Sequence, residues 1–372
     1  MPEDERSYYL AWQLLIPGQS RRFRDLLAVF GSAQEAFTAG CGQLAQVVGK
    51  TQAEEITKKR GALDLNLELD RLERLGVGFV TPVDDTYPDL LREIYDPPAA
   101  LFHRGDITLE ETTVAVVGTR RCSDYGRWVA EDLGKQLAQA GITVVSGLAR
   151  GVDTAAHRGA LAGKGRTVAV LGNGLDGCYP RENSRLMEDI AVKGTVVSEF
   201  PCGMPCQAWH FPVRNRVIAG LSRAVVVVEA KERSGALITA DLALEQGREV
   251  MAVPGNVTSP VSCGPNNLLR QGARPVTCAA DVMDALGMGF SPEADPGMHA
   301  LNRLESLILT LLSDESLSRE DVIQRAGEAA SNVLAGLVYL EMKGLIRSLP
   351  GGVYAAVRKS RETSCRNKPV RL

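Results

Sequence analysis

Long apolar runs are missing from this sequence. No stretch of about 18 apolar residues occurs among its 372 residues, so no membrane-spanning helix is predicted. The first residues, Met1–Arg6, are acidic and lack the basic start and apolar stretch of a signal peptide. The eight cysteines are scattered along the chain, which is typical of reduced thiols, and we expect a cytoplasmic protein.

Charge of one sign and aromatic residues are also scarce. The formal net charge is −3, from 42 Lys and Arg against 45 Asp and Glu. This balance excludes a histone-like polycation but not a local nucleic-acid site. Aromatic residues make up 5% of the chain, which predicts a mostly aliphatic core. The remaining composition is that of a globular protein, and the length predicts about two to three domains.

The common signatures of nucleotide hydrolysis, acyl transfer and metal binding are absent. The sequence has no Gly-Lys-Ser/Thr of a P-loop and no Gly-x-Ser-x-Gly elbow. Its four histidines are too scattered to suggest a catalytic triad. Cys202, Cys206 and His210 are spaced by four residues, but a fourth zinc ligand is not nearby. We therefore expect no metal and no cofactor.

The hydrophobic pattern changes along the chain and predicts five segments. Residues 1–82 read as a helical module. Residues 83–287 alternate Val-rich runs with helical patterns, which indicates an α/β domain with a doubly wound parallel sheet. Residues 288–300 have the composition of a linker. Residues 301–357 predict three helices and a hairpin, resembling a winged helix, and the basic tail 358–372 is expected to be solvated and disordered.

Two smaller patterns leave alternatives open. Residues 44–56 resemble a helix-hairpin-helix motif, whose glycine turn offers N–H groups to a DNA phosphate. The usual second glycine is absent, since Lys50 and Thr51 follow Gly49, so DNA contact and simple helix packing are both possible. In the winged-helix-like segment the third helix, 329–343, carries few basic residues, which favours protein interaction or packing over duplex binding.

Glycine, small hydroxyls and arginine recur in the loops that follow the predicted strands. In an open parallel sheet these loops meet at one edge, where ligands bind. Glycines let the backbone approach a phosphate, helix N-termini aim N–H groups at it, and arginine supplies charge. We therefore predict a phosphate-binding edge that includes Gly118, Thr119, Arg120, Ser146, Gly147, Arg150, Arg181, Ser234, Gly235 and Thr239. In one of these loops Asp153 precedes His157 by one helical turn, which predicts an ion pair.

The segment Trp209–Gly220 combines arginines with aromatic rings. This composition is typical of single-strand binders, in which charges follow the backbone and rings stack on bases. In the other interpretation, Phe211 and Ile218 are core residues and Arg214 caps an acid. The DNA-binding candidates here are His210, Phe211, Arg214, Asn215 and Arg216.

Seven motifs occur in a fixed order between residues 118 and 255. They are Gly-Thr-Arg (118–120), Ser-Gly-Leu-Ala-Arg-Gly-Val-Asp-Thr-Ala-Ala-His (146–157), Tyr-Pro-Arg-Glu-Asn (179–183), Ser-Glu-Phe-Pro (198–201), Phe-Pro-Val-Arg-Asn-Arg-Val-Ile-Ala-Gly-Leu-Ser (211–222), Ser-Gly-Ala-Leu-Ile-Thr-Ala (234–240) and Val-Pro-Gly (253–255). Over residues 85 to 285 the chain closely resembles the DNA-processing protein A family, also called Smf.

The resemblance implies a bacterial cytoplasmic protein with an extended Rossmann-like domain. A SAM- or helix-hairpin-helix-like module and a winged helix would flank it. Members of the family bind single-stranded DNA, protect incoming DNA and load the RecA recombinase during natural transformation. They commonly form homodimers, and catalysis is not expected.

The resemblance also assigns roles by position. Arg120 would contact the DNA backbone, and Arg181 occupies a basic position after Tyr-Pro. Arg214 and Arg216 would line the same groove, with His210 and Phe211 near it. The stretch from Ser234 to Thr239 would form a phosphate-binding turn.

A nucleotide-binding enzyme of the phosphoribohydrolase type is the alternative. That related Rossmann fold uses Pro-Gly-Gly-x-Gly-Thr-x-x-Glu to hold and cleave a nucleoside monophosphate. Here the corresponding stretch, 233–241, lacks the double glycine, and no Glu stands in register. These differences disfavour the enzyme.

Overall fold

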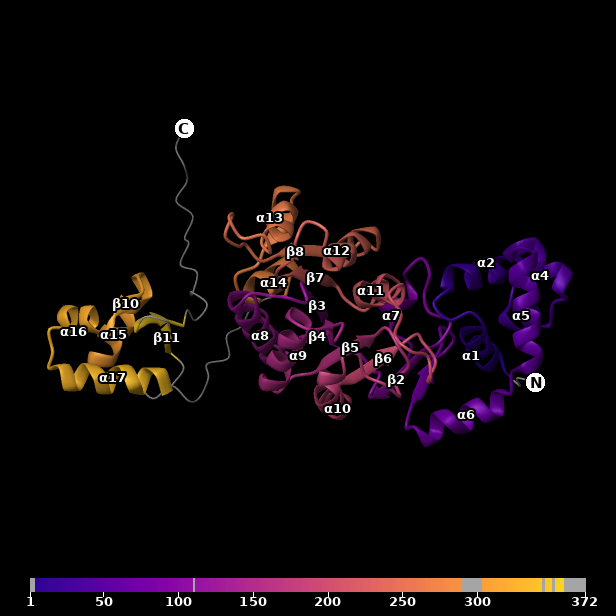
Figure 1. Ribbon diagram of the computed structural model, residues 1–372, viewed down its shortest axis with the longest axis horizontal. Coiled ribbons are helices and arrows are strands. Elements are labelled where there is room, and N and C mark those ends of the chain that lie inside the picture. Colours follow the sequence, from indigo (N-terminus) through magenta and orange to yellow (C-terminus); the bar gives the residue numbers. More distant parts are fainter. Residues whose placement is uncertain (1–3, 110, 289–302, 343–344, 350–351, 358–372) are drawn as a thin grey trace. The chain divides into compact units, whose positions relative to one another are not determined.

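The computed structural model describes residues 4–109, 111–288, 303–342, 345–349 and 352–357. The chain divides into two compact units, Met1–Gly289 and Phe290–Leu372 (Figure 1). Among the described residues, no helix is long and apolar enough to cross a membrane. Each unit is described by itself below.

The first unit begins with helices that pack around aromatic side chains. Their bounds are α1 (Glu5–Leu15), α2 (Ser20–Phe30), α3 (Ala33–Thr38), α4 (Cys41–Val48), α5 (Lys50–Ala62) and α6 (Leu65–Arg74). Trp12, Phe23 and Phe37 are buried in their core, and the ring centres of Trp12 and Phe23 are 5.9 Å apart. Gly49 has a φ of +83° between α4 and α5, so the predicted helix–glycine–helix hairpin is confirmed.

A nine-stranded sheet follows in the order β1-β2-β6-β5-β4-β3-β7-β8-β9. The strands from β6 to β9 are parallel, which confirms the doubly wound α/β fold. Two short antiparallel strands at the β6 edge, β1 and β2, were not predicted, because residues near 80 read as helical and those after them as turns. The strands are β1 (Gly78–Val80), β2 (Leu101–Gly105), β3 (Thr113–Val117), β4 (Thr143–Ser146), β5 (Thr167–Leu171), β6 (Thr195–Ser198), β7 (Ala224–Val227), β8 (Glu249–Ala252) and β9 (Arg274–Pro275).

Helices cover both faces of this sheet. Buried residues of α11, α12 and α13 pack in one core with the strands, and those of α8, α9 and α14 pack in another. Both cores are aliphatic apart from Tyr87, as the composition predicted. The helices after β1 are α7 (Asp89–Arg92), α8 (Asp124–Gln139), α9 (Val152–Ala162), the 3-10 turn η1 (Arg181–Asn183), α10 (Ser184–Lys193), α11 (His210–Gly220), α12 (Gly235–Glu245), α13 (Cys263–Arg270) and α14 (Ala279–Ala285).

The second unit has the winged-helix arrangement that the sequence predicted. Its elements are α15 (Arg303–Asp314), β10 (Leu317–Ser318), α16 (Arg319–Ala326), α17 (Ala330–Met342), β11 (Ile346–Leu349) and β12 (Val353–Ala356), with strand order β10-β12-β11. Ser318 caps α16 by accepting from the N–H of Asp321 at 3.1 Å. The predicted linker from residue 289 and the predicted basic tail lie outside the described residues.

Candidate nucleic-acid interface

A cavity of about 420 Å³ opens at the carboxyl edge of the parallel sheet. Loops after β3, β4 and β7 surround it, together with the first turns of α11 and α12. The sequence analysis predicted this edge from the loop chemistry, and most of its candidates line the cavity. They are Gly118, Thr119, Arg120, Phe211, Arg214, Asn215, Ser234, Gly235 and Thr239.

The loop after β3 is held in place by Glu229, just beyond β7. Thr119 donates its N–H to the Glu229 carbonyl at 2.7 Å. The Glu229 carboxylate accepts from the N–H and hydroxyl of Ser123 at 2.8 and 2.5 Å, where α8 begins. Gly118 is required at the start of this loop, because a Cβ there would lie 2.5 Å from a methyl group of Val152. The result is a rigid loop that presents Arg120 at the cavity mouth.

Arg214 forms a buried part of the cavity wall. It is only 4% exposed and donates to the carbonyls of Gly147, at 2.7 Å, and Val170. Burial lowers the pKa of Arg214 to about 10, and nearby Asp153 opposes this shift. A Cβ on Gly147 would lie 2.5 Å from the guanidinium, so glycine is needed there. Arg214 thus ties the loop after β4 to strand β5 and also lines the cavity.

Asp153 is the one carboxylate among the described residues that line the cavity. It accepts from the N–H groups of Gly147 and Ala149 at 3.1 and 3.4 Å. Burial raises its pKa, and the Arg214 charge opposes that shift. The predicted pair with His157 is wrong, because the His157 ring Nδ1 lies 2.7 Å from the Thr167 hydroxyl instead. Asp153 therefore holds the turn before α9.

Exposed cations surround the cavity mouth. Arg120, Arg121, Lys231 and Arg233 line it, are exposed, and form no salt bridge within the described part of the chain. The sequence analysis missed Arg121, Lys231 and Arg233. Their positions beside Gly-Thr-Arg and just before Ser234 were the signal that could have found them.

Aromatic rings lie beside these cations. The guanidinium carbon of Arg120 stands 4.4 Å from the centre of the Phe211 ring. The Phe211 ring centre is in turn 5.8 Å from that of Tyr179, which is 48% exposed. At the opposite wall, Ser234 caps α12 by accepting from Ala236 N–H at 3.4 Å. Positive charge, exposed rings and a helix N-terminus thus meet at one edge, which suits a phosphate-linked chain of bases.

Two exposed DNA-binding candidates, Arg150 and Arg181, do not line the 420 Å³ cavity. Arg150 is paired with Glu182 through two contacts of 2.9 and 2.8 Å, so its charge is largely satisfied. Arg181 lines a neighbouring cavity of about 590 Å³ together with Tyr179. Its guanidinium forms no salt bridge among the described residues.

Three buried candidates, Ser146, His210 and Arg216, have structural partners. The Ser146 hydroxyl donates to the Val116 carbonyl at 2.7 Å. The His210 ring is stacked on Phe200 with ring centres 4.0 Å apart, and its Nδ1 lies 2.7 Å from the Gly172 carbonyl. Burial lowers the pKa of His210, against the effect of that carbonyl.

Arg216 does not lie where the resemblance implied, in one groove with Arg214. Its guanidinium, 6% exposed, pairs with buried Glu199 and donates to the Ser20 hydroxyl at 2.9 Å. A second carboxylate, Asp96, lies 3.6 Å away. Arg216 therefore joins α11 to the N-terminal helices and does not share the groove of Arg214.

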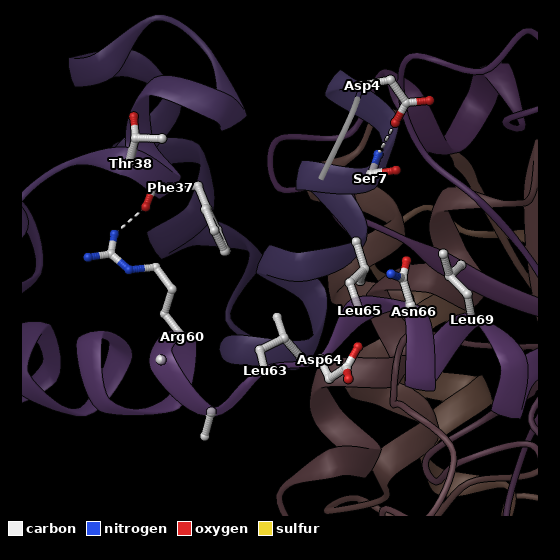
Figure 2. Close-up of a pocket in the computed structure, with 12 residues that line it drawn as sticks. Asp4, Ser7, Phe37, Thr38, Arg60, Leu63, Asp64, Leu65, Asn66 and Leu69 are labelled. Carbon is white, nitrogen blue, oxygen red and sulfur yellow. Dashed lines mark hydrogen bonds between the residues drawn. The ribbon is translucent and has the colours of Figure 1, made fainter. Parts of the chain in front are cut away.

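A larger cavity of about 1000 Å³ lies among the N-terminal helices (Figure 2). Its charged groups are already engaged. Asp4 and Asp64 cap α1 and α6 by accepting from backbone N–H groups at 2.8 and 3.1 Å. Arg60 donates to the carbonyls of Phe37 and Ala39. The cavity offers little charge to a ligand. Among the described residues, no group of three or more His, Cys, Asp or Glu could hold a metal ion.

The fold and this edge define a class: a Rossmann-like α/β protein with a cation-lined cavity at the carboxyl edge of its sheet, followed by a winged helix. The family model of DNA recombination-mediator protein A matches residues 78–287, more than half of the chain, and that of the DprA winged helix domain matches residues 292–352. The chain belongs to the DNA-processing protein A (DprA/Smf) family.

Several relatives support this membership. Protein Smf of Synechocystis sp. is 33% identical and covers 95% of this chain and 99% of its own length. Protein Smf of Escherichia coli is 41% identical over a match that covers 75% of this chain and 77% of that protein. The crystal structure of DNA processing protein A from Streptococcus pneumoniae has a TM-score of 0.67 at 36% identity, covering 76% of this chain and 99% of that one. DNA processing protein A from Helicobacter pylori, whose structure concerns its single-stranded DNA binding mode, has a TM-score of 0.51 at 29% identity. The match covers 56% of this chain and 95% of that one.

Proposed function

We propose that this protein is a single-stranded DNA-binding recombination mediator. The observation that carries the proposal is the set of exposed, unpaired cations at the cavity mouth, beside the rings of Phe211 and Tyr179. Cations release counterions when they neutralise phosphates, and rings stack on bases of any sequence. The single-stranded DNA binding described for the Helicobacter pylori relative supports the same assignment.

The assignment of phosphate contacts follows exposure. Arg120, Arg121, Lys231 and Arg233 are free to neutralise phosphates, while Arg214 supplies fixed charge from the wall. Phe211, backed by the Arg120 guanidinium at 4.4 Å, is placed to meet a base. Arg216 is assigned a structural role, since Glu199 already pairs with it.

The finer function follows from the family. We propose that the protein protects incoming DNA and loads RecA recombinase on it during natural transformation, in the cytoplasm of competent cells and as a homodimer. The site acts by binding, without catalysis. In support, the one carboxylate of the cavity, Asp153, already accepts two backbone N–H groups and is poorly placed for acid–base chemistry.

The first test is a salt titration of DNA binding. Replacing Arg120 by Ala should weaken binding to a labelled single strand and reduce the slope of log affinity against log salt by about 0.7, the contribution of one phosphate contact. Fluorescence anisotropy across a salt series measures both. Lys135→Ala is the matched control, because Lys135 is exposed near the far end of α8. An unchanged affinity and slope in Arg120→Ala would remove Arg120 from the site.

Two further measurements address the finer function. RecA filaments should form faster on single strands in the presence of the protein, and no acceleration would argue against loading. Incubation with nucleoside monophosphates should leave them intact. Their hydrolysis would instead favour the phosphoribohydrolase alternative.

A further inference from the structure

The N-terminal helices carry cations that the cavity does not use. Arg21, Arg22 and Arg24 stand in the first turns of α2. Arg21 and Arg22 are exposed and form no salt bridge within the described residues, whereas Arg24 is paired with Asp25 at 2.9 Å. The start of α2 therefore has a net positive charge.

An exposed ring lies beside these arginines. Tyr95 is 64% exposed, although it sits next to the well-packed turn after α7. The guanidinium carbon of Arg24 is 3.6 Å from the centre of the Tyr95 ring, and that of Arg21 is 5.6 Å away. An exposed ring with guanidinium groups against it is the kind of surface on which nucleic-acid bases stack.

Arg22 extends the positive surface to the hairpin of α4 and α5. It donates to the Gln52 side chain at 3.0 Å in the first turn of α5, where Lys50 is exposed. The acid Glu55 on the same helix is paired with Lys59 at 2.8 Å. Lys50 is the one cation in the first turn of α5 and forms no salt bridge within the described residues, although exposed Glu54 follows it on the same helix.

Trp209 lies between this surface and the cavity. It is 45% exposed, and its ring is so close to the turn before α2 that a Cβ on Gly18 would lie 3.1 Å from it. On its other side the Trp209 ring centre is 4.1 Å from that of His210, the residue before Phe211. The helix α11 that starts here is joined to α2 by the Arg216–Ser20 hydrogen bond. Half-buried Phe211 at the cavity and exposed Trp209 near α2 are therefore separated by one buried residue, His210.

We propose that a DNA strand held in the cavity continues over Trp209 onto a second binding surface, the α2 surface, formed by Arg21, Arg22, Arg24, Lys50 and Tyr95. The inference rests on the proposed single-stranded DNA binding and extends it to the N-terminal helices. The cations of the α2 surface neutralise further phosphates, and Tyr95 stacks on a base. The surface thus gives the helix–glycine–helix hairpin a DNA-binding role beside its packing role.

The test compares short and long strands. An oligonucleotide of about 6 nucleotides fills the cavity alone, and one of about 25 reaches both surfaces. The double variant Arg21→Ala/Arg22→Ala should bind the long strand about tenfold more weakly, with a salt slope lower by about 1.4 for two lost contacts. Tyr95→Ala should also lose about tenfold for the long strand. Neither variant should change binding of the short strand.

Controls separate this inference from the proposed function. Lys58→Ala removes an exposed charge from α5 outside the α2 surface and should leave both affinities unchanged. Thermal unfolding checks that each variant is folded. Unchanged long-strand affinity in both α2 variants, or a loss confined to duplex DNA, would overturn the inference while the cavity site stands. If the unaltered protein bound neither the short nor the long oligonucleotide, both this inference and the proposed single-stranded DNA binding would be overturned.

Discussion

Burial decides what each charged residue of the site does. Arg214 and Arg216 are two residues apart on α11, and both are nearly buried. Arg214 donates to loop carbonyls at the cavity wall, whereas Arg216 pairs with Glu199 away from it. Breaking a buried pair of this kind leaves an uncompensated charge, which costs about 3–5 kcal/mol. Loss of DNA binding in an Arg216 variant would therefore report on folding as well as on contact.

Burial also decides the protonation state of His157. It is fully buried, and desolvation lowers its pKa to about 3 from an ordinary value of 6.5, with Arg214 adding to the shift. The Thr167 hydroxyl donates to the Val144 carbonyl, so its oxygen is left to accept from His157 Nδ1–H. This hydrogen bond requires a proton on Nδ1, and burial keeps the ring neutral.

The His157 pKa predicts a loss of stability in mild acid. Below pH 6.5 His157 takes up a proton in the unfolded chain but stays neutral in the folded protein. The contribution of His157 to the free energy of unfolding therefore falls as the pH drops from 6.5 toward 3. Between pH 7.5 and 5.5 the free energy of unfolding should fall by about 1.4 kcal/mol more in the unaltered protein than in His157→Gln. Urea denaturation at the two pH values measures the difference. Equal pH dependence in both proteins would refute this assignment.

At the scale of elements, α8 and α9 approach each other closely because glycines face their neighbours' backbones. A Cβ on Gly159 would lie 1.9 Å from the Glu131 carbonyl oxygen, and one on Gly134 would lie 2.4 Å from that of Ala156. The contact matters for the site, since the loop that carries Arg120 leads into α8 and Asp153 stands in the first turn of α9.

Gly159→Ala should therefore force α8 and α9 apart. We expect the free energy of unfolding to fall by about 1–3 kcal/mol, as in other overpacked interiors. Gly61→Ala is the matched control. A Cβ on Gly61 in α5 meets nothing within 4 Å, so alanine should be neutral or stabilise by up to about 1 kcal/mol. Chemical denaturation compares the two variants, and equal effects would contradict the close-packing explanation.

At the scale of the whole molecule, the cavity and the α2 surface both belong to the first compact unit. In the described part of the winged-helix unit, α17 has no Lys or Arg and exposes Leu334 and Val338 instead. Duplex binding through this helix would need basic residues, so we expect the first unit to carry the DNA-binding surface.

A chain that ends at Gly289 should keep its affinity for single strands within about threefold. The reason is that every residue assigned here to a phosphate or a base precedes that position. Anisotropy with the full chain and the shortened chain measures this directly. A loss of tenfold or more would place part of the binding surface in the second unit.

The sequence alone predicted which loops meet at the carboxyl edge of the sheet. Alternating Val-rich strands and helices determined the doubly wound sheet, and strand ends of a parallel sheet meet at one edge whatever the details of packing. That rule predicted Arg120 and Ser234 at this edge, and the combination of arginines and rings in Trp209–Gly220 added Phe211; all three line the cavity. The strands β1 and β2 were missed, because Gly78–Val80 and Leu101–Gly105 are not the Val-rich runs that indicated the other strands.

The tertiary structure alone decided which polar side chains remain free. Spacing along α11 cannot distinguish Arg214 from Arg216, since the partners of Arg216 come from distant segments: Glu199 directly follows β6, and Ser20 begins α2. Nor can it show that Tyr95 and Arg24, far apart in the chain, lie ring against guanidinium. Sequence patterns determine local conformation and which loops share an edge, whereas solvent exposure and ion pairing depend on contacts between distant segments.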